Sequence, residues 1–208
     1  MGEKFNNTLE PEFFIFTSPG FGNCYLWQNS PFSDFYAAIT GYTDVIDFIY
    51  QNEDLACEDK LYPLIYMFRN DIELCLKRLF YSRVENGVPL NVFMAKRKSH
   101  YIKKDLWKNV KNVITSYGTS SAEELQTIEV VEKLLDEINN VDKNGDTFRY
   151  PTSYSLEYRL DNRMIDLSNV YLCLRSIISF LDDCDSQLDA FAEYEQEIRH
   201  EYESDMYL

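Results

Sequence analysis

The strongest constraint on the fold is a helical spacing of apolar residues that recurs along most of the chain. It is clearest between Asp59 and Ser82, where apolar side chains return every three or four residues. These side chains are Leu64, Ile65, Phe68, Ile72, Cys75, Leu76 and Leu79. Such spacing places them on one face of an α-helix. Because the alternating pattern of a half-buried strand is scarce, the sequence predicts an all-α protein.

The same spacing predicts five further helices. They cover residues 33 to about 50, 103–117, 121–138, 163–184 and 187–208. Ser33 or Asp34 is expected to cap the first of these helices. The run Ser120-Ser121-Ala122-Glu123-Glu124 offers two overlapping capping boxes for the helix that follows it. The stretch Asn86-Gly87-Val88-Pro89 is expected to break the chain.

Three parts are expected along the chain: an aromatic N-terminal arm over residues 1–32, a helical bundle over residues 33–184, and an acidic C-terminal helix over residues 185–208. The arm is rich in Phe, Pro, Gly and Asn. Its Gly20-Phe21-Gly22 lacks the third Gly and the Lys-Ser/Thr of a phosphate-binding loop, so we expect an arm packed over the helices instead.

Composition narrows the class of protein. The chain has 208 residues, is 45% hydrophobic and carries a net charge of −15. It is long enough to bury a core without disulfides or metals, and too acidic for a general nucleic-acid coat protein. The five cysteines are scattered, no secretory signal is evident, and no stretch approaches the ~18 apolar residues of a membrane span. We therefore expect a cytoplasmic protein that is not in a membrane.

The charge is unevenly distributed. Residues 182–208 contain ten acids and one basic residue, whereas the segment Lys96–Lys111 carries seven basic residues and one acid. This basic segment includes His100, one of only two histidines. It is either a solvated loop and helix start, or a surface that attracts the phosphates of RNA or a nucleotide, with His100 as an acid or base.

A second polar pattern lies on the helix expected over residues 59–82. Tyr62, Tyr66, Arg69, Glu73 and Lys77 recur at three- and four-residue steps and so share one face. Their charged members form either a solvated ladder of ion pairs or a polar seam in which Arg69 positions an anionic group. The sequence leaves both alternatives open.

No metal or cofactor is expected. The loop Asp142-Lys143-Asn144-Gly145-Asp146 superficially resembles a calcium loop, but its Gly comes one place early and the twelfth position is Ser153. We expect a tight turn there. The acids Asp182, Asp183, Asp185 and Asp189 are interpreted as a solvated face rather than a metal cluster.

Three motifs in order resemble an uncharacterised prokaryotic group of HEPN-type (higher eukaryotes and prokaryotes nucleotide-binding) helical proteins. The first is Arg69-x3-Glu73-Leu74-x-Leu76-Lys77, preceded by aromatic residues. The second is the segment His100–Trp107, and the third is Phe148-Arg149-Tyr150-Pro151 after an acidic turn. The resemblance covers about residues 33–184.

This resemblance implies a bundle of four or five helices that usually forms dimers. Many members of the family act in toxin–antitoxin, CRISPR-associated or phage-defence systems as metal-independent ribonucleases. Catalytic members carry an Arg, then four to six intervening residues and a His, usually near the final helix. Here Arg175 is followed by Ser176-Ile177-Ile178-Ser179-Phe180-Leu181-Asp182, without a His.

Three functions follow as hypotheses. The first is an interaction or regulatory subunit of a prokaryotic conflict system, acting as a homodimer or with a protein partner. The second is a metal-independent ribonuclease in which His100 takes a 2′-hydroxyl proton and Arg69 or Arg149 steadies the phosphate. The third is a nucleotide sensor. The candidate ligand-binding residues are Tyr66, Glu73, Lys77 and Tyr150.

Overall fold

The chain folds as an all-α bundle, which confirms the predicted fold class. The computed structural model describes residues 31–85, 100–117, 121–150, 152–153, 155–158, 160 and 164–205. Its helices are α1 (Pro31–Gln51), α2 (Cys57–Glu85), the π-helix η1 (Ile102–Trp107), α4 (Lys108–Ser116), α5 (Ala122–Val141) and α6 (Leu167–Asp205). Among these residues the only β-type pairing is an isolated bridge between Thr152 and Tyr158. The arm expected over residues 1–32 and the break expected at 86–89 lie almost wholly outside the described residues.

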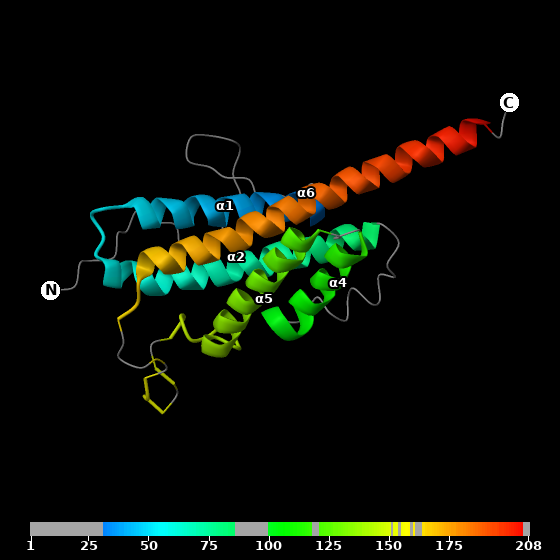
Figure 1. The fold of residues 1–208 in the computed structure, drawn as a ribbon. Coiled ribbons are helices and arrows are strands. Elements are labelled where there is room, and N and C mark those ends of the chain that lie inside the picture. Colours follow the sequence, from blue (N-terminus) through cyan, green and yellow to red (C-terminus); the bar gives the residue numbers. More distant parts are fainter. Residues whose placement is uncertain are drawn as a thin grey trace, which may run out of the picture.

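The bundle is built around α2. α1 and α6 run along α2, while η1 and α4 contact it elsewhere, and α5 packs against η1 and α6 (Figure 1). The side chains at the centre are almost fully buried. They are Ile46, Leu64, Phe68, Ile72, Leu76, Leu79, Trp107, Val110, Val113, Leu135, Ile177 and Leu181. The apolar face predicted for residues 59–82 therefore forms the middle of the core.

The helix starts show which capping predictions were right. Ser121 caps α5 as the second of the two expected capping boxes: its Oγ accepts from the Glu124 N–H at 3.1 Å, and the Glu124 carboxylate accepts from the Ser121 N–H at 3.1 Å. For α1 the prediction is wrong, because the helix begins at Pro31, before Ser33 and Asp34. Proline suits a first helical position because its missing N–H would have no partner there.

The helix expected over residues 103–117 is instead a π-helical turn followed by α4. The Leu106 N–H bonds the Tyr101 carbonyl, five residues back, at 3.3 Å. This wider turn lets Ile102, Leu106 and Trp107 all point inward, and all three are buried. A regular α-helix would place Trp107 well away from the other two, so burial of the large indole accounts for the π-helical turn.

The two helices expected over residues 163–184 and 187–208 are one continuous element, α6. Asp185, interpreted from sequence as part of a solvated acidic face, is buried instead. The Arg78 Nε donates to its Oδ2 at 2.6 Å, and the Tyr36 hydroxyl donates to the same oxygen at 2.7 Å. The polar run near residue 185 therefore anchors α6 to α2 and α1 without interrupting the helix. Asp182 and Asp183 are exposed.

None of the helices in the described part of the chain combines the length and the apolar character that crossing a membrane requires.

Candidate functional site

Arg69 lies at the centre of a buried polar network on α2. Only 6% of the residue is exposed. Its Nη1 is 3.2 Å from the Glu73 Oε2, its Nε is 3.3 Å from the Asp142 Oδ2, and its Nη2 donates to the backbone carbonyl of His100 at 2.9 Å. Arg69 is thus surrounded by protein acceptors, because α2, the end of α5 and the segment before η1 meet at its guanidinium.

The loop after α5 closes over this guanidinium. Asp142 is buried, and its Oδ1 accepts from the Thr147 N–H at 3.0 Å, which fixes the turn. Gly145 adopts φ +78°, and a Cβ built there would lie 2.7 Å from the Arg69 Cζ. Glycine is required at this position for both reasons. The segment that resembles a calcium loop is therefore a tight turn, as predicted, and it covers Arg69.

Glu73 joins Arg69 to two further candidates, Lys77 on the same helix and His100 in the segment before η1. Its Oε1 accepts from the Lys77 Nζ at 2.7 Å and lies 2.8 Å from the His100 Nδ1. Burial raises the pKa of Glu73, but the hydrogen bonds from Lys77 and His100 outweigh it, so the pKa lies below its ordinary value. Glu73 is accordingly a carboxylate. The Arg69–Glu73–Lys77 ladder exists, but of the two alternatives the solvated ladder is wrong, because Arg69 and Glu73 are buried.

His100 is the exposed member of the network. Its side chain is 70% exposed, although its Nδ1 is held by a buried carboxylate. When a carboxylate accepts from Nδ1–H, the neutral imidazole carries its lone pair on Nε2, which is the tautomer that can accept a proton. The arrangement orients an accessible acid–base group on the surface, next to the exposed Tyr101.

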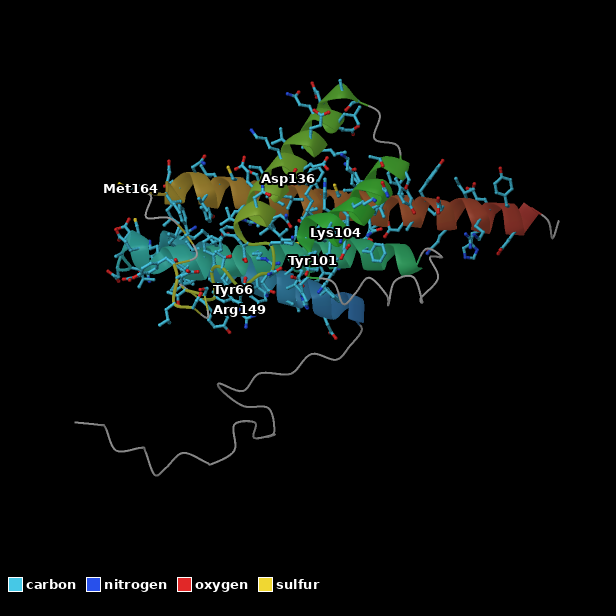
Figure 2. The ribbon with its side chains drawn as sticks, turned by 90° about the horizontal axis from the view of Figure 1, so that it is seen from below. Tyr66, Tyr101, Lys104, Asp136, Arg149 and Met164 are labelled. Carbon is cyan, nitrogen blue, oxygen red and sulfur yellow. The ribbon has the colours of Figure 1, made fainter. Side chains whose placement is uncertain are left out.

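Arg149 lies on the same side of α2, near Tyr66. Its guanidinium carbon is 5.8 Å from the centre of the Tyr66 ring and 5.6 Å from that of Tyr150, and Figure 2 shows Arg149 beside Tyr66. Arg149 and Tyr150 are exposed. Phe148, which precedes them, is buried against Tyr62 with ring centres 5.8 Å apart. This packing holds the Phe-Arg-Tyr motif against α2.

The structure thus brings two of the three candidate catalytic residues into contact. Arg69 and His100 share Glu73, and Arg69 bonds the His100 backbone. Arg149 is placed by Tyr66, seven residues before Glu73, which corresponds to about 10 Å along a helix. Arg149 is accessible to a ligand, whereas Arg69 is enclosed. The hypothesis of a nucleotide sensor built on Arg69, Glu73 and Lys77 stays a prediction, and those three groups already pair with one another.

The basic segment is partly neutralised by α5. Lys103 pairs with Asp136, and Lys111 pairs with Glu132. Lys104 and Lys108 are exposed and one helical turn apart, while residues 96–99 lie outside the described part of the chain. In the described part, the cations turned to solvent are therefore fewer than the sequence count suggests.

A second surface of interest lies on α6. Where α6 leaves the bundle, a groove of about 470 Å³ opens between α4 and α6. It is lined mainly by apolar and aromatic side chains: Ile114, Tyr117, Cys184, Leu188, Phe191 and Tyr194. Beyond it α6 projects past the other helices (Figure 1). Phe191, Tyr194, Ile198 and Tyr202 form one stripe along this part, here called the distal stripe, with Phe191 43%, Tyr194 61% and Tyr202 72% exposed.

Sequence reasoning missed several residues that matter in the interior. Asp71 is fully buried on α2, and its Oδ2 accepts from the Thr43 hydroxyl at 2.9 Å. Burial raises its pKa to about 6, although the Thr43 hydrogen bond opposes that rise. Asp142 is equally buried. No local pattern marks the burial of these acids, because the residues that cover them come from other segments. The one signal available was the Asp142-Lys143-Asn144-Gly145 stretch, which predicts a turn at Asp142.

In the described residues, no group of three or more His, Cys, Asp and Glu side chains is arranged to hold a metal ion. Comparisons with models of known families, with curated proteins and with solved structures find no match to this chain.

Proposed function

We propose that this protein works by association, as a HEPN-like interaction or regulatory subunit of a cytoplasmic prokaryotic conflict system, in phage defence or a toxin–antitoxin pair. The observation that carries the proposal is the distal stripe. An amphipathic helix is ordinarily covered along its apolar face, and contiguous exposed apolar surface marks interaction sites. In the described chain, the part of α6 beyond the groove has no helix packed over this stripe.

The association is expected to involve either a second copy or a different protein. The three-motif resemblance to HEPN proteins supports the wider assignment, and the absence of a His at the family's spacing after Arg175 favours association over the usual chemistry of the family. Arg175 instead lies with its Nε 3.5 Å from the Asp47 Oδ1, where it joins α6 to α1.

A photo-crosslinking amino acid placed at Tyr194 tests this function in expressing cells of the source organism. We expect ultraviolet light to give a discrete covalent adduct, with a second copy or with another protein. The matched control is Tyr158, which is 83% exposed but lies outside the distal stripe, and no adduct is expected there. Equal labelling at both positions, or none at Tyr194, would contradict the proposal.

A second candidate function, metal-independent RNA cleavage, is favoured by one observation. The His100 imidazole is exposed and is held at 2.8 Å by the buried Glu73 carboxylate. This is the arrangement of a general base with an orienting carboxylate. In this mechanism His100 accepts the proton of a ribose 2′-hydroxyl, whose oxygen attacks the adjacent phosphorus, and the 5′-oxygen leaves.

The phosphate in this second candidate would be steadied by Arg149. Arg69, the other cation considered from sequence, is enclosed by Glu73, Asp142 and the His100 carbonyl, so its role would be to position the segment that carries His100. Tyr66 and Tyr150 flank Arg149 and offer ring faces on which a base can stack.

The test is cleavage of labelled RNA by purified protein in the presence of chelator. We expect His100→Ala to lower the rate by about 100-fold or more, in line with loss of a general base. His200→Ala is the matched control, because His200 is the other histidine and is exposed on α6. Intact RNA with the wild-type protein would exclude this candidate.

A further inference from the structure

Acidic side chains of α6 lie beside the distal stripe. Ile198 and Tyr202 lie on one shallow surface with Glu195, Arg199 and Glu203. Glu193, Gln196 and Glu197 lie on a different surface of the same helix, with His200. Glu195, four residues after Phe191 and three before Ile198, therefore borders the stripe, whereas Glu193 lies on the opposite side of the helix.

The apolar surface continues from the stripe into the groove at the edge of the bundle. Phe191 and Tyr194 belong to both, and the Tyr117 ring from the end of α4 lies 5.9 Å from the Phe191 ring. Stripe and groove together form one elongated apolar surface that runs along α6. Its shape matches an α-helix laid lengthwise, with anchor residues at three- and four-residue spacing.

Charge decides what kind of helix fits. Residues 182–208 carry a net charge of −9, so pairing this segment with the same segment of a second copy would bring two strongly acidic surfaces together. The exposed cations of η1 and α4, Lys104 and Lys108, lie on a surface whose apolar side chains Ile102, Leu106 and Trp107 are buried. That surface carries positive charge, but its apolar side chains are buried, so it has few of them with which to cover the distal stripe of a second copy.

We infer that the surface formed by the groove and the distal stripe binds a basic amphipathic helix of a protein partner. The partner's apolar side would cover Phe191, Tyr194, Ile198 and Tyr202, and its Lys or Arg side chains would face Glu195 and Glu203. This inference rests on the proposed function of association and names the chemistry of the partner. Opposite charges along the border would speed the encounter and exclude acidic competitors.

The experiment uses the full chain and a fluorescein-labelled 18-residue peptide of Leu and Lys, with Leu at positions i, i+3, i+4 and i+7. A peptide of the same composition in scrambled order is the control ligand. Fluorescence anisotropy gives Kd at increasing NaCl. We expect the patterned peptide to bind more tightly than the scrambled one, and its Kd to rise with salt.

Three variants locate the contact. Ile198→Ser with Tyr202→Ser should weaken binding about tenfold or more, because each loses a buried apolar anchor. Glu195→Gln should weaken it roughly threefold, whereas Glu193→Gln, the same charge change on the opposite side of the helix, should have under about a 1.5-fold effect. Circular dichroism of each variant checks that the helices are intact.

Equal affinity for the patterned and scrambled peptides, or equal effects of Glu195→Gln and Glu193→Gln, would overturn the inference. Sedimentation of the wild-type chain that shows a dimer abolished by Ile198→Ser would also overturn it, because a second copy would then occupy the stripe. In that case the Tyr194 adduct would still form and the proposed function would stand. Absence of that adduct would contradict the proposed function itself.

Discussion

The two halves of α6 have the same spacing of apolar residues and different surroundings. In the proximal half, up to Leu188, the inner face is covered by the bundle, and Leu174, Ile178 and Leu181 are buried. In the distal half the face continues as the distal stripe and is exposed at Phe191, Tyr194 and Tyr202. The comparison teaches that an amphipathic pattern specifies that a face is to be covered, whereas the rest of the fold decides whether the same chain covers it.

The halves also differ in how their acids are used. The boundary residue Asp185 accepts from Arg78 and Tyr36, and so ties α6 to α2 and α1. Farther along, Glu193 and Glu197 are exposed on the outer surface. Asp185 is thus part of the folded core, whereas Glu193 and Glu197 set the charge of a surface.

The largest effect that separates the halves is expected from Asp185→Ala. This change leaves the buried Arg78 guanidinium without its main partner, which costs about 3–5 kcal/mol of the free energy of unfolding. Glu197→Ala removes an acid from the distal half and should change that energy by less than about 0.5 kcal/mol. Urea denaturation followed by circular dichroism measures both. Similar losses in the two variants would erase the distinction between the halves.

A somewhat smaller contrast is expected for apolar side chains. Leu181 is 1% exposed, and Leu181→Ala should destabilise the fold by about 2–4 kcal/mol through lost burial and the cavity that remains. Tyr202→Ala in the distal stripe should change the free energy of unfolding by less than about 0.5 kcal/mol in the isolated protein. A large loss for Tyr202→Ala at low protein concentration would show that the stripe is covered within one chain.

The smallest effect concerns the acid buried where α1, α2 and the proximal half of α6 meet. Asp71 has a pKa raised from 3.8 to about 6, so between these pH values the folded state binds more protons than the unfolded state. Its contribution makes the free energy of unfolding fall as pH rises from about 4 to 6. Asp71→Asn keeps an acceptor for Thr43 and should remove this fall, with a gain of about 1 kcal/mol at pH 7.

Denaturation curves recorded from pH 4 to pH 8 test the last prediction. The difference between Asp71→Asn and the wild-type chain should grow as the pH rises and become constant above the pKa of Asp71. A difference that does not change with pH would mean that the carboxyl titrates equally in the folded and unfolded states.

Much of the fold was predictable because helices depend on local spacing. The α2 face, the Ser121 capping box and the all-α class all follow from residues within a few positions of each other. The errors have a physical cause as well. The sequence predicted a break between two helices near Asp185 because an acid without a partner favours solvent. Its partner Arg78 could not be recognised because it lies 107 positions away in the sequence. The η1 turn was missed because the space available to Trp107 is set by other helices.

The candidate site was predictable in part for the same reason. Arg69, Glu73 and Lys77 fall on one face through i,i+4 spacing, which sequence shows directly. That His100 joins Glu73, and that Asp142 and Gly145 close over Arg69, depends on loops meeting in space. The burial of Arg69 argues against its predicted role in binding an anion, because its guanidinium is already enclosed by acceptors of the protein.

The sequence by itself determined the helices, their apolar faces and the concentration of acid at the C-terminal end, because each is a property of neighbouring residues. Only the tertiary structure decided which charges are buried and which apolar face remains open. A side chain is buried only where another segment packs against it. Beyond the groove α6 projects past the other helices (Figure 1), so no described helix covers its apolar face there. The exposed distal stripe is the consequence.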